Sequence, residues 1–571
     1  MERLLFSIVP ILFSGLCFSQ TDINLTYQSL LGGNGVDSET GINRLSDGNF
    51  LISGYTESGN LEMIDEFQTN NAGNTEGYVA IINPEGQPVF TSYLGGSGID
   101  IIESASESGS GNIVLAGTTR SEDFPLLNDD GTSFDGFSMG FLTKIDPEEG
   151  VIWSTLVGGT GTDNILSIDI DNSGDIYLVG TTSSPELGTS GVYQTELTDT
   201  DQTSGFIAKY SSGGEKLWYS YVEGLGSVNP QEIQLVEETG TVVLFGYVSN
   251  SLLSGSGLHQ QDFGGGFLDC LLMTFDMTDG SLNWFTYYGG EGIDGSGNLC
   301  VDTENNIYIS GNTSSTANIS SIGSHQEMNA GSDDLFIAKF DIEGNRLWAT
   351  YYGAGNIDAN AKLALSGSNG LILGGRTRSE GGLAFGNPIL NSVELDPIPP
   401  FIASSFLSRF DQDGNLIWST YAPENYRCGS LSEMVISEEK IYLVGRFGNY
   451  PTLSECYGTT PDAFQSVYGG GDTDMGIFIY TDNTLSTSFP QTEPLSVYPN
   501  PASDFITIEI PDLLWAGMEL TVTDLSGRLV DRVTRFQSGN SYATSHLSNG
   551  VYILTGRVGD RLFREKVVIN H

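Results

Sequence analysis

The sequence predicts an all-β chain, namely a seven-bladed β-propeller of four-stranded blades followed by a small Ig-like β-sandwich. Two observations carry this prediction. A unit of roughly 65 residues recurs seven times, which is typical of radial repeat architectures. Within each unit, apolar residues alternate with period two between turns rich in Gly, Asn, Asp and Ser, as in strands. Before residue 490 we find no convincing helical periodicity.

Composition sets limits on the function. The chain has 571 residues, of which 39% are hydrophobic, and this is enough for a folded core. Its 22 Lys and Arg against 72 Asp and Glu give a formal charge of -50. This balance excludes most nucleic-acid binding, because phosphate contacts need clustered basic residues. The acidic surplus indicates solubility in a salty medium, with a cation-binding surface as the alternative.

Residues 1–19 have the pattern of a secretory signal peptide. Arg3 is the positive start, an apolar run covers 4–16, and Ser19 is a small residue at a cleavage position. We expect the mature chain to begin at Gln20. No later stretch reaches 18 apolar residues, so no transmembrane span is predicted.

Each repeat unit has an aromatic residue five positions before a Gly-rich loop. Tryptophan fills this position in five units, which predicts core packing rather than a sugar-stacking stripe. The seven anchors are Tyr27, Phe90, Trp153, Trp218, Trp284, Trp348 and Trp418.

Three further pieces complete each unit: a β-rich run ending in Gly, a variable loop, and an alternating strand. The loop often has an aromatic residue before Gln. His259 and His325 occupy this position in two units, so we expect them to pack as aromatic residues do. The strand that contains Tyr27 begins the first unit, and the strand at 477–480 ends the last unit. We expect these two strands to pair and close the ring.

Segments such as "YLGGSGID" and "GNIVLAGTTRSEDFP" resemble the SBBP-type β-propeller repeat of secreted bacterial proteins. The resemblance covers roughly 27–481 and implies the propeller fold, but no shared activity. The fourth unit departs from it at Glu223 and the sixth at Ala354, which replace two loop glycines.

The Gly-rich loops invite a calcium interpretation, with Asp37, Asp100, Asp163 and Asp294 as the candidate ligands. Shared calcium ions in β-rolls need loop copies nine residues apart, whereas these copies are a whole repeat apart. We therefore favour structural turns, with calcium as the alternative, and predict no other cofactor.

Four cysteines remain in the mature chain, an even number that permits two disulfides. Cys428 and Cys456 are the favoured pair, because both lie in irregular segments of one repeat. No pattern for a nucleophile–base site or a metal-hydrolase site is found. A carboxylate pair for glycoside hydrolysis stays open, because the acidic residues offer many candidates.

Composition changes after a short polar linker at 486–494, and a new strand pattern fills 495–571. These residues closely resemble the type A C-terminal sorting domain of the Bacteroidetes type IX secretion system. The residues that carry the match are Tyr498, Pro499, Asn500, Pro501, Gly527, Arg528, Gly550, Tyr552 and Lys566. The resemblance implies export across the outer membrane, recognition of 495–571 by the translocon, and attachment to surface lipopolysaccharide.

We therefore expect a 20–485 propeller that reaches the extracellular space or the outer-membrane surface. The favoured function is non-catalytic binding or adhesion, with glycans as ligands, through loops at the blade ends. The alternative is a polysaccharide-acting hydrolase or lyase that uses carboxylates in the propeller channel. Paired carboxylates near the axis with shifted pKa values would favour the enzyme.

Overall fold

The computed structural model describes residues 23–109, 111–129, 131–198, 202–223, 227–249, 258–366, 370–386, 388–392, 404–422, 429–448, 459–482, 493–494, 496–509, 517–524, 529–537, 541–558 and 561–571. In these ranges every regular element is a strand, and none is a helix. The described residues accordingly include no helix that could cross a membrane. The chain divides into two compact units at residues 483 and 484. The predicted signal peptide, 1–19, lies outside the described residues.

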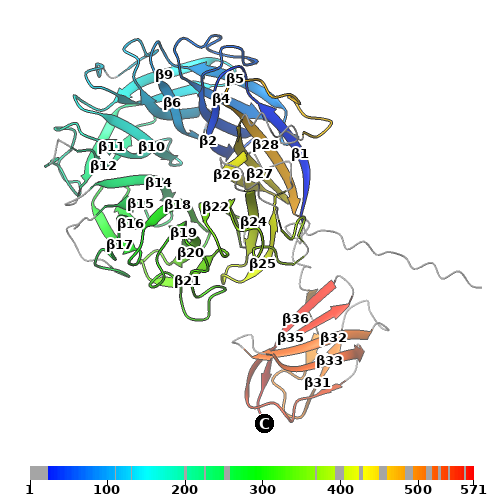
Figure 1. Ribbon diagram of the computed structural model, residues 1–571. Helices are drawn as coiled ribbons and strands as arrows, with labels where there is room; N and C mark the ends of the chain where they lie inside the picture. The colour runs from blue at the N-terminus through cyan, green and yellow to red at the C-terminus, as the bar shows by residue number, and fades with distance from the viewer. Residues whose placement is uncertain are drawn as a thin grey trace, which may run out of the picture. The chain divides into compact units, whose positions relative to one another are not determined.

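The first unit consists of seven four-stranded antiparallel sheets arranged around a common axis (Figure 1). In six of the sheets, the four strands are arranged in chain order, with the first strand innermost and the fourth outermost. The first three are β2 (Asp37–Arg44), β3 (Phe50–Thr56), β4 (Glu76–Ile82) and β5 (Pro88–Leu94); β6 (Asp100–Glu107), β7 (Ile113–Thr119), β8 (Met139–Asp146) and β9 (Gly150–Val157); and β10 (Asp163–Ile170), β11 (Ile176–Thr182), β12 (Ser204–Tyr210) and β13 (Lys216–Val222).

The next three blades repeat this order. They are β14 (Val228–Val236), β15 (Thr241–Val248), β16 (Asp269–Asp276) and β17 (Leu282–Tyr288); β18 (Asp294–Val301), β19 (Ile307–Thr313), β20 (Asp334–Phe340) and β21 (Arg346–Tyr352); and β22 (Asp358–Leu365), β23 (Leu371–Thr377), β24 (Ser404–Phe410) and β25 (Leu416–Tyr421). The seven-bladed architecture predicted from the repeat is confirmed.

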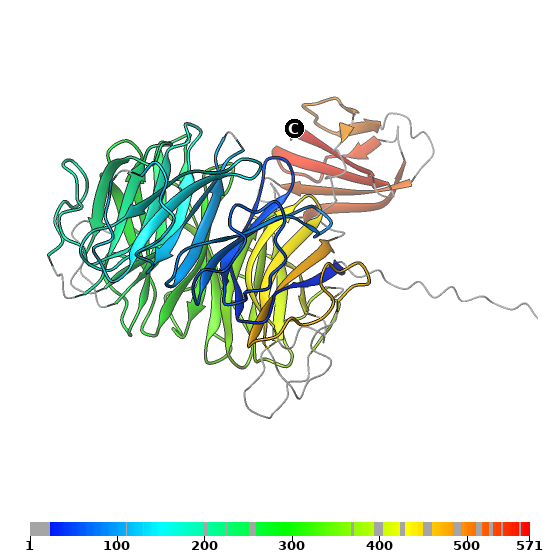
Figure 2. The same ribbon diagram turned by 90° about the horizontal axis from the view of Figure 1, so that it is seen from above.

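The seventh blade joins the two ends of the propeller chain. It contains β26 (Gly429–Ser437), β27 (Lys440–Gly448) and β28 (Thr473–Asp482), and its outermost strand is β1 (Ile23–Leu31). β1 runs antiparallel to β28 with Gln28 opposite Phe478, so the predicted closure is confirmed. Figure 2, in which the molecule is seen from above, shows β1 in dark blue beside the yellow and orange strands of this last blade.

The repeated aromatic residues fasten each blade to the next. The indole N–H of Trp153, Trp284 and Trp348 donates to a backbone carbonyl in the turn between the third and fourth strands of the following blade, at 2.9–3.2 Å. The glycine of that turn has positive φ and faces the ring: a Cβ on Gly414 would lie 2.8 Å from the Trp348 side chain. The aromatic residues are therefore structural, as predicted.

The two loop histidines also pack as predicted. His259 lies 6.2 Å from Tyr288 and 5.8 Å from Phe340 between ring centroids. His325 has the equivalent contacts in the next blade. Burial lowers the pKa of His259 to about 4, so this side chain is neutral at physiological pH.

The second unit is a small β-sandwich, as predicted. One sheet has the order β29-β36-β35-β32-β33 and the other β30-β31-β34. Its apolar core includes Ile506, Leu520, Leu554 and Val567. The strands are β29 (Glu493–Pro494), β30 (Ser496–Tyr498), β31 (Phe505–Glu509), β32 (Gly517–Asp524), β33 (Leu529–Gln537), β34 (Ser541–Ala543), β35 (Gly550–Val558) and β36 (Arg561–Ile569).

Candidate functional site

A central channel with a cavity volume of about 1020 Å³ lies within the propeller. Its walls come from the innermost strands of all seven blades, which are β2, β6, β10, β14, β18, β22 and β26. The volume is at the upper end of the range for small-molecule sites, roughly 300–1,000 Å³. None of the residues that line it is aromatic.

One register position repeats around this channel. Each innermost strand has an irregularity in its pairing with the second strand, and the fifth residue of the strand lies at that point. All seven of these residues line the channel. We call them the axial ring: Gly41, Ser104, Ser167, Glu232, Asn298, Lys362 and Glu433.

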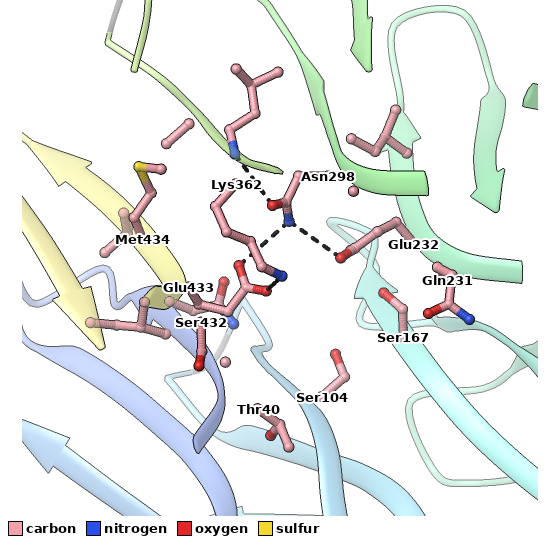
Figure 3. A pocket seen from close by; sticks show the side chains of 18 of the residues that line it. Thr40, Ser104, Ser167, Gln231, Glu232, Asn298, Lys362, Ser432, Glu433 and Met434 are labelled. Atoms are coloured by element: carbon pink, nitrogen blue, oxygen red, sulfur yellow. Dashed lines mark hydrogen bonds and ion pairs between the residues drawn. The ribbon is translucent and has the colours of Figure 1, made fainter. Parts of the chain in front are cut away.

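The axial ring is asymmetric. Three consecutive blades contribute small residues, and the other four contribute Glu232, Asn298, Lys362 and Glu433. Figure 3 shows these four side chains converging. The amide nitrogen of Asn298 lies 3.4 Å from a carboxylate oxygen of Glu232 and 3.4 Å from one of Glu433. The Lys362 ammonium donates a hydrogen bond to Glu433 in an ion pair.

Backbone contacts fix the orientation of Asn298. Its Oδ1 accepts a hydrogen bond from Leu363 N at 3.3 Å, and its own N–H donates to Ser310 Oγ at 3.2 Å. Because Oδ1 is occupied, Nδ2 faces the two carboxylates. Asn298 is 8% exposed, whereas the Lys362 and Glu433 side chains retain 22% and 20% exposure. The ion pair is therefore mostly buried but keeps some surface that a ligand in the channel can contact.

The two carboxylates differ in their electrostatic surroundings. Burial raises the pKa of Glu232 to about 8, and the neighbouring Glu433 adds to this shift while Lys362 opposes it. Burial also disfavours the Lys362 ammonium, but Glu433, Glu232 and Glu39 outweigh it and raise the Lys362 pKa. Near neutral pH, Glu232 is therefore a protonated donor, while Lys362 forms its ion pair with Glu433.

Other acids along the channel are also shifted. Burial raises the pKa of Glu39 to about 7, although Ser432 and Arg446 lower it in part. Burial alone raises the pKa of Glu103 to about 7. Burial raises the pKa of Asp169 to about 6 despite hydrogen bonds from backbone N–H groups. The channel thus holds several carboxyl groups that change charge near neutral pH.

The four aspartates proposed for calcium are not brought together, because each begins the innermost strand of a different blade. All are buried, and Oδ2 of each accepts a hydrogen bond from a loop glycine N–H at 2.7–2.9 Å and one from a serine hydroxyl at 2.6–3.0 Å. These bonds give each carboxylate a role in holding the loop between blades. No group of three or more metal-ligating side chains occurs in the described part of the chain.

A second buried acid lies beside four of the blade junctions, at the first or second residue of the third strand. These acids are Glu76, Asp269, Asp334 and Asp474, and their neighbours are Asp100, Asp294, Asp358 and Asp37. The first residue of the Gly-rich loop passes close to them: a Cβ on Gly289 would lie 2.5 Å from Asp269 and 2.8 Å from Asp294. This close approach explains why the loop needs glycine there.

Glu223, which departs from the repeat pattern, has a structural explanation. The third strand of its blade begins with Ser204 instead of an acid. Glu223 accepts hydrogen bonds from Gln194 Nε2 at 2.7 Å and Thr198 N at 3.0 Å, as Asp334 does from Gln326 and Ala330. The Glu223 carboxylate thus accepts hydrogen bonds from groups equivalent to those that bind Asp334, although it stands at a different position in the repeat unit.

The predicted disulfide residues, Cys428 and Cys456, lie outside the described residues. Cys270 and Cys300 are free thiols. Cys300 lines the channel, and its Sγ lies 3.3 Å from the Leu363 carbonyl oxygen.

The sorting-domain residues hold the ends of the second unit together. Asn500 Oδ1 accepts a hydrogen bond from Val568 N at 2.9 Å, which ties the Tyr498–Pro501 segment to the last strand. Gly550 begins β35, and the buried Tyr552 donates to the Ser548 carbonyl at 3.0 Å. Lys566 lies in β36, while Gly527 and Arg528 fall outside the described residues.

Sequence reasoning left the channel carboxylates open and did not identify the axial ring. Aligning the seven units on the first residue of the innermost strand, which is Asp in five of them, and reading four residues onward would have found it. The position reads Gly, Ser, Ser, Glu, Asn, Lys, Glu, so four consecutive units have a large polar or charged residue there.

The comparisons with known proteins agree with the two-part architecture. Residues 496–570 match the model of the secretion system C-terminal sorting domain, and residues 152–185 match that of the β-propeller repeat SBBP. An uncharacterised WD repeat-containing protein, L264 of Acanthamoeba polyphaga mimivirus, is 23% identical over 375 residues. That match covers 55% of this chain and 26% of the viral protein.

Solved structures give lower similarity. The polysaccharide lyase Uly1 has a TM-score of 0.41 at 11% identity, with 82% of this chain and 94% of that one covered. The WD40 β-propeller domain of Doa1 has a TM-score of 0.39 at 8% identity, covering 80% and 97%. PorZ of the Porphyromonas gingivalis type IX secretion system has a TM-score of 0.24 at 10% identity, covering 96% and 86%. Similarities at this level carry no argument about a ligand or a reaction.

The chain thus carries an SBBP-type β-propeller repeat and a secretion-system C-terminal sorting domain, and the latter indicates export to the cell surface or the extracellular space.

Proposed function

We propose that this exported propeller is a non-catalytic binding protein that takes up a hydroxyl-rich ligand, such as a segment of a glycan, in its central channel. The observation that supports the proposal is the axial ring, in which Glu232, Asn298, Lys362 and Glu433 present polar groups from four consecutive blades. Such convergent polar groups in a roomy channel are typical of ligand sites.

The chemistry of the ring suits hydroxyl groups. A protonated Glu232 donates and accepts hydrogen bonds, the Lys362 ammonium donates, and Glu433 accepts. Ser104 and Ser167 add hydroxyls on the opposite side of the ring. Without an aromatic platform among the lining residues, recognition would depend on hydrogen bonds and charge rather than on stacking against sugar rings.

This proposal moves the expected binding surface from the blade-end loops to the channel. The polar groups of the Gly-rich loops are used within the protein, as the bonds between Asp100, Gly96 and Ser121 show. Lys362 supplies the positive charge beside Glu433, so the proposed site requires no cofactor. Independently of the channel, we propose that the translocon recognises 495–571 and that the protein is attached to lipopolysaccharide, with calcium at the blade junctions as an alternative to purely structural turns.

A glycan array probed with the full-length mature protein tests the proposal. We expect wild type to bind a subset of glycans and Lys362→Gln to lose at least about tenfold in affinity, because a charged hydrogen bond contributes about 1.5–3 kcal/mol. Lys216→Gln, an exposed change in β13, is the charge-matched control and should bind as wild type does. Absence of glycan binding by wild type, or unchanged binding by Lys362→Gln, would contradict the proposal.

The second candidate function is cleavage of a polysaccharide. One observation favours it: Glu232, whose pKa burial raises to about 8, lies across the Asn298 amide from a second carboxyl group, that of Glu433. In such an enzyme, Glu232 would protonate the leaving oxygen and Glu433 would act as base or nucleophile. Chromatography of glycans incubated with wild type distinguishes the two functions. New reducing ends that vanish in Glu433→Gln would establish the enzyme, and intact glycans would support binding alone.

A further inference from the structure

A second position repeats on the second strand of each blade, and three of its seven residues line the channel. It is the residue that pairs with the second residue of the innermost strand. In blade order these residues are Tyr55, Thr118, Thr181, Tyr247, Asn312, Arg376 and Arg446. Arg376 and Arg446 belong to neighbouring blades, and both line the channel near the end where the innermost strands begin.

Basic residues in this place need an explanation, because the chain has only 22 Lys and Arg among 571 residues. Three of them, Lys362, Arg376 and Arg446, line one sector of the channel formed by the sixth and seventh blades. Elsewhere the protein repels anions through its net charge of -50. All three cations of the channel wall are thus gathered in one sector, where an anionic ligand can meet them.

The two guanidinium groups are open to a ligand. Arg376 is half-buried, and no carboxylate of the described residues lies within 4.0 Å of it. Arg446 keeps 43% exposure, and its Nε lies 3.6 Å from Glu39. That distance is longer than a charge-assisted hydrogen bond, so the guanidinium retains donors for another acceptor.

We propose that the channel selects saccharides that carry carboxylate or sulfate groups, and that Arg376 and Arg446 bind the anionic group at the channel entrance while Lys362 contacts the chain more deeply. The inference rests on the proposed binding function and assigns its ligand class. Guanidinium groups suit this task, because their planar fork donates two parallel hydrogen bonds to carboxylate or sulfate oxygens.

The charges that face the site set its pH dependence. Besides the three cations, the titratable side chains of the channel wall are Glu39, Glu103, Asp169, Glu232, Glu433 and Cys300. Four of these acids become protonated as the pH falls from about 8 to about 6. The wall thereby loses negative charge while the cations stay charged, so binding of an acidic saccharide should strengthen on acidification.

Titration calorimetry of the full-length mature protein tests the inference with two matched probe pairs. Oligogalacturonate is compared with its methyl ester, and oligosaccharides of κ-carrageenan are compared with those of unsulfated agarose. We expect an acidic probe to bind at least about tenfold more tightly than its neutral counterpart, and more tightly at pH 6 than at pH 8. Preferential binding of oligogalacturonate would indicate a carboxylate ligand, and preferential binding of the κ-carrageenan oligosaccharides would indicate a sulfated one.

Variants locate the effect. Arg376→Gln and Arg446→Gln should each remove most of the preference for the acidic probe, whereas Arg120→Gln, an exposed change outside the channel wall, should keep it. Thermal melting checks that each variant is folded. Equal binding of acidic and neutral probes would overturn the inference and leave the binding function standing. No binding of any probe would overturn both.

Discussion

At the scale of single residues, the axial ring depends on Lys362. This ammonium is the only cation among the seven ring residues, and it faces Glu433 directly and Glu232 across Asn298. The ion pair is largely buried, and removal of one partner from such a pair leaves the other charge without compensation.

We therefore predict that Lys362→Met destabilises the propeller by roughly 2–4 kcal/mol. The double variant Lys362→Met/Glu433→Gln should recover much of this loss, because the carboxylate that lost its partner is then neutral. Urea denaturation of both variants measures the difference. A double variant less stable than the single one would contradict this assignment of charge.

The sequence could predict the packing residues individually but not the ring. The aromatic anchors and the two loop histidines follow from repetition at one position, and their contacts agree with it. The ring residues differ from blade to blade, so no repeated letter marks Glu232, Asn298 or Lys362 as neighbours. Their proximity results only from closure around the axis.

At the scale of elements, the junction between blades is built from a Gly-rich loop and buried carboxylates. The first loop residue passes beside Asp269 and Asp294, which leaves no room for a side chain at Gly289. Asp at the strand start and glycine in the loop were visible in the sequence. The second acid was not, because it does not keep one place in the repeat: in the third blade, Glu223 of the loop accepts the hydrogen bonds that an acid of the third strand accepts elsewhere.

Gly289→Ala should therefore destabilise the propeller by about 1–3 kcal/mol, the usual range for overpacking. Gly355→Ala is the control, because Gly355 is the third residue of the corresponding loop at the next junction and a Cβ there would meet open space. Thermal denaturation of the two variants should show a lower Tm for Gly289→Ala only. Equal melting temperatures would contradict the close approach.

The paired acids should also make stability depend on pH. Burial raises the pKa of Glu76, Asp269 and Asp474 to about 7 and that of Asp334 to about 6, and each neighbouring carboxylate adds to the shift. The folded state thus binds more protons than the unfolded state between about pH 4 and pH 7, so stability falls as the pH rises through that window.

Melting curves between pH 4.5 and pH 8 measure this effect. The net charge of -50 acts in the same direction, so a control is needed. Replacing the four acids by Gln or Asn should flatten the dependence, because these amides do not titrate in this range. If the melting temperature of the quadruple variant depends on pH as that of wild type does, the effect comes from general charge repulsion and not from the four acids.

At the scale of the whole molecule, the channel exists because seven blades close into a ring. Closure depends on β1, which completes the blade of β26, β27 and β28. Trp418 of the sixth blade also donates its indole N–H to Asp482 in this last blade at 3.2 Å. The number of repeats, and the points within a repeat unit at which the propeller chain begins and ends, predicted this arrangement. Both can be read from the linear sequence.

A chain that begins at residue 32 lacks β1 and should melt at a markedly lower temperature. Adding a peptide of residues 20–31 should restore much of the lost Tm, because the peptide can pair with β28. A scrambled peptide of the same composition is the control. Unchanged melting of the shortened chain would show that closure contributes little to stability.

Hydrogen–deuterium exchange of the full-length mature protein, with and without an acidic oligosaccharide, shows whether a ligand enters the channel. We expect the ligand to slow exchange in β14, β18, β22 and β26, whose residues Glu232, Asn298, Lys362 and Glu433 line the channel. Protection confined to the outer strands or the blade-end loops, with the four innermost strands unchanged, would contradict a ligand site in the channel.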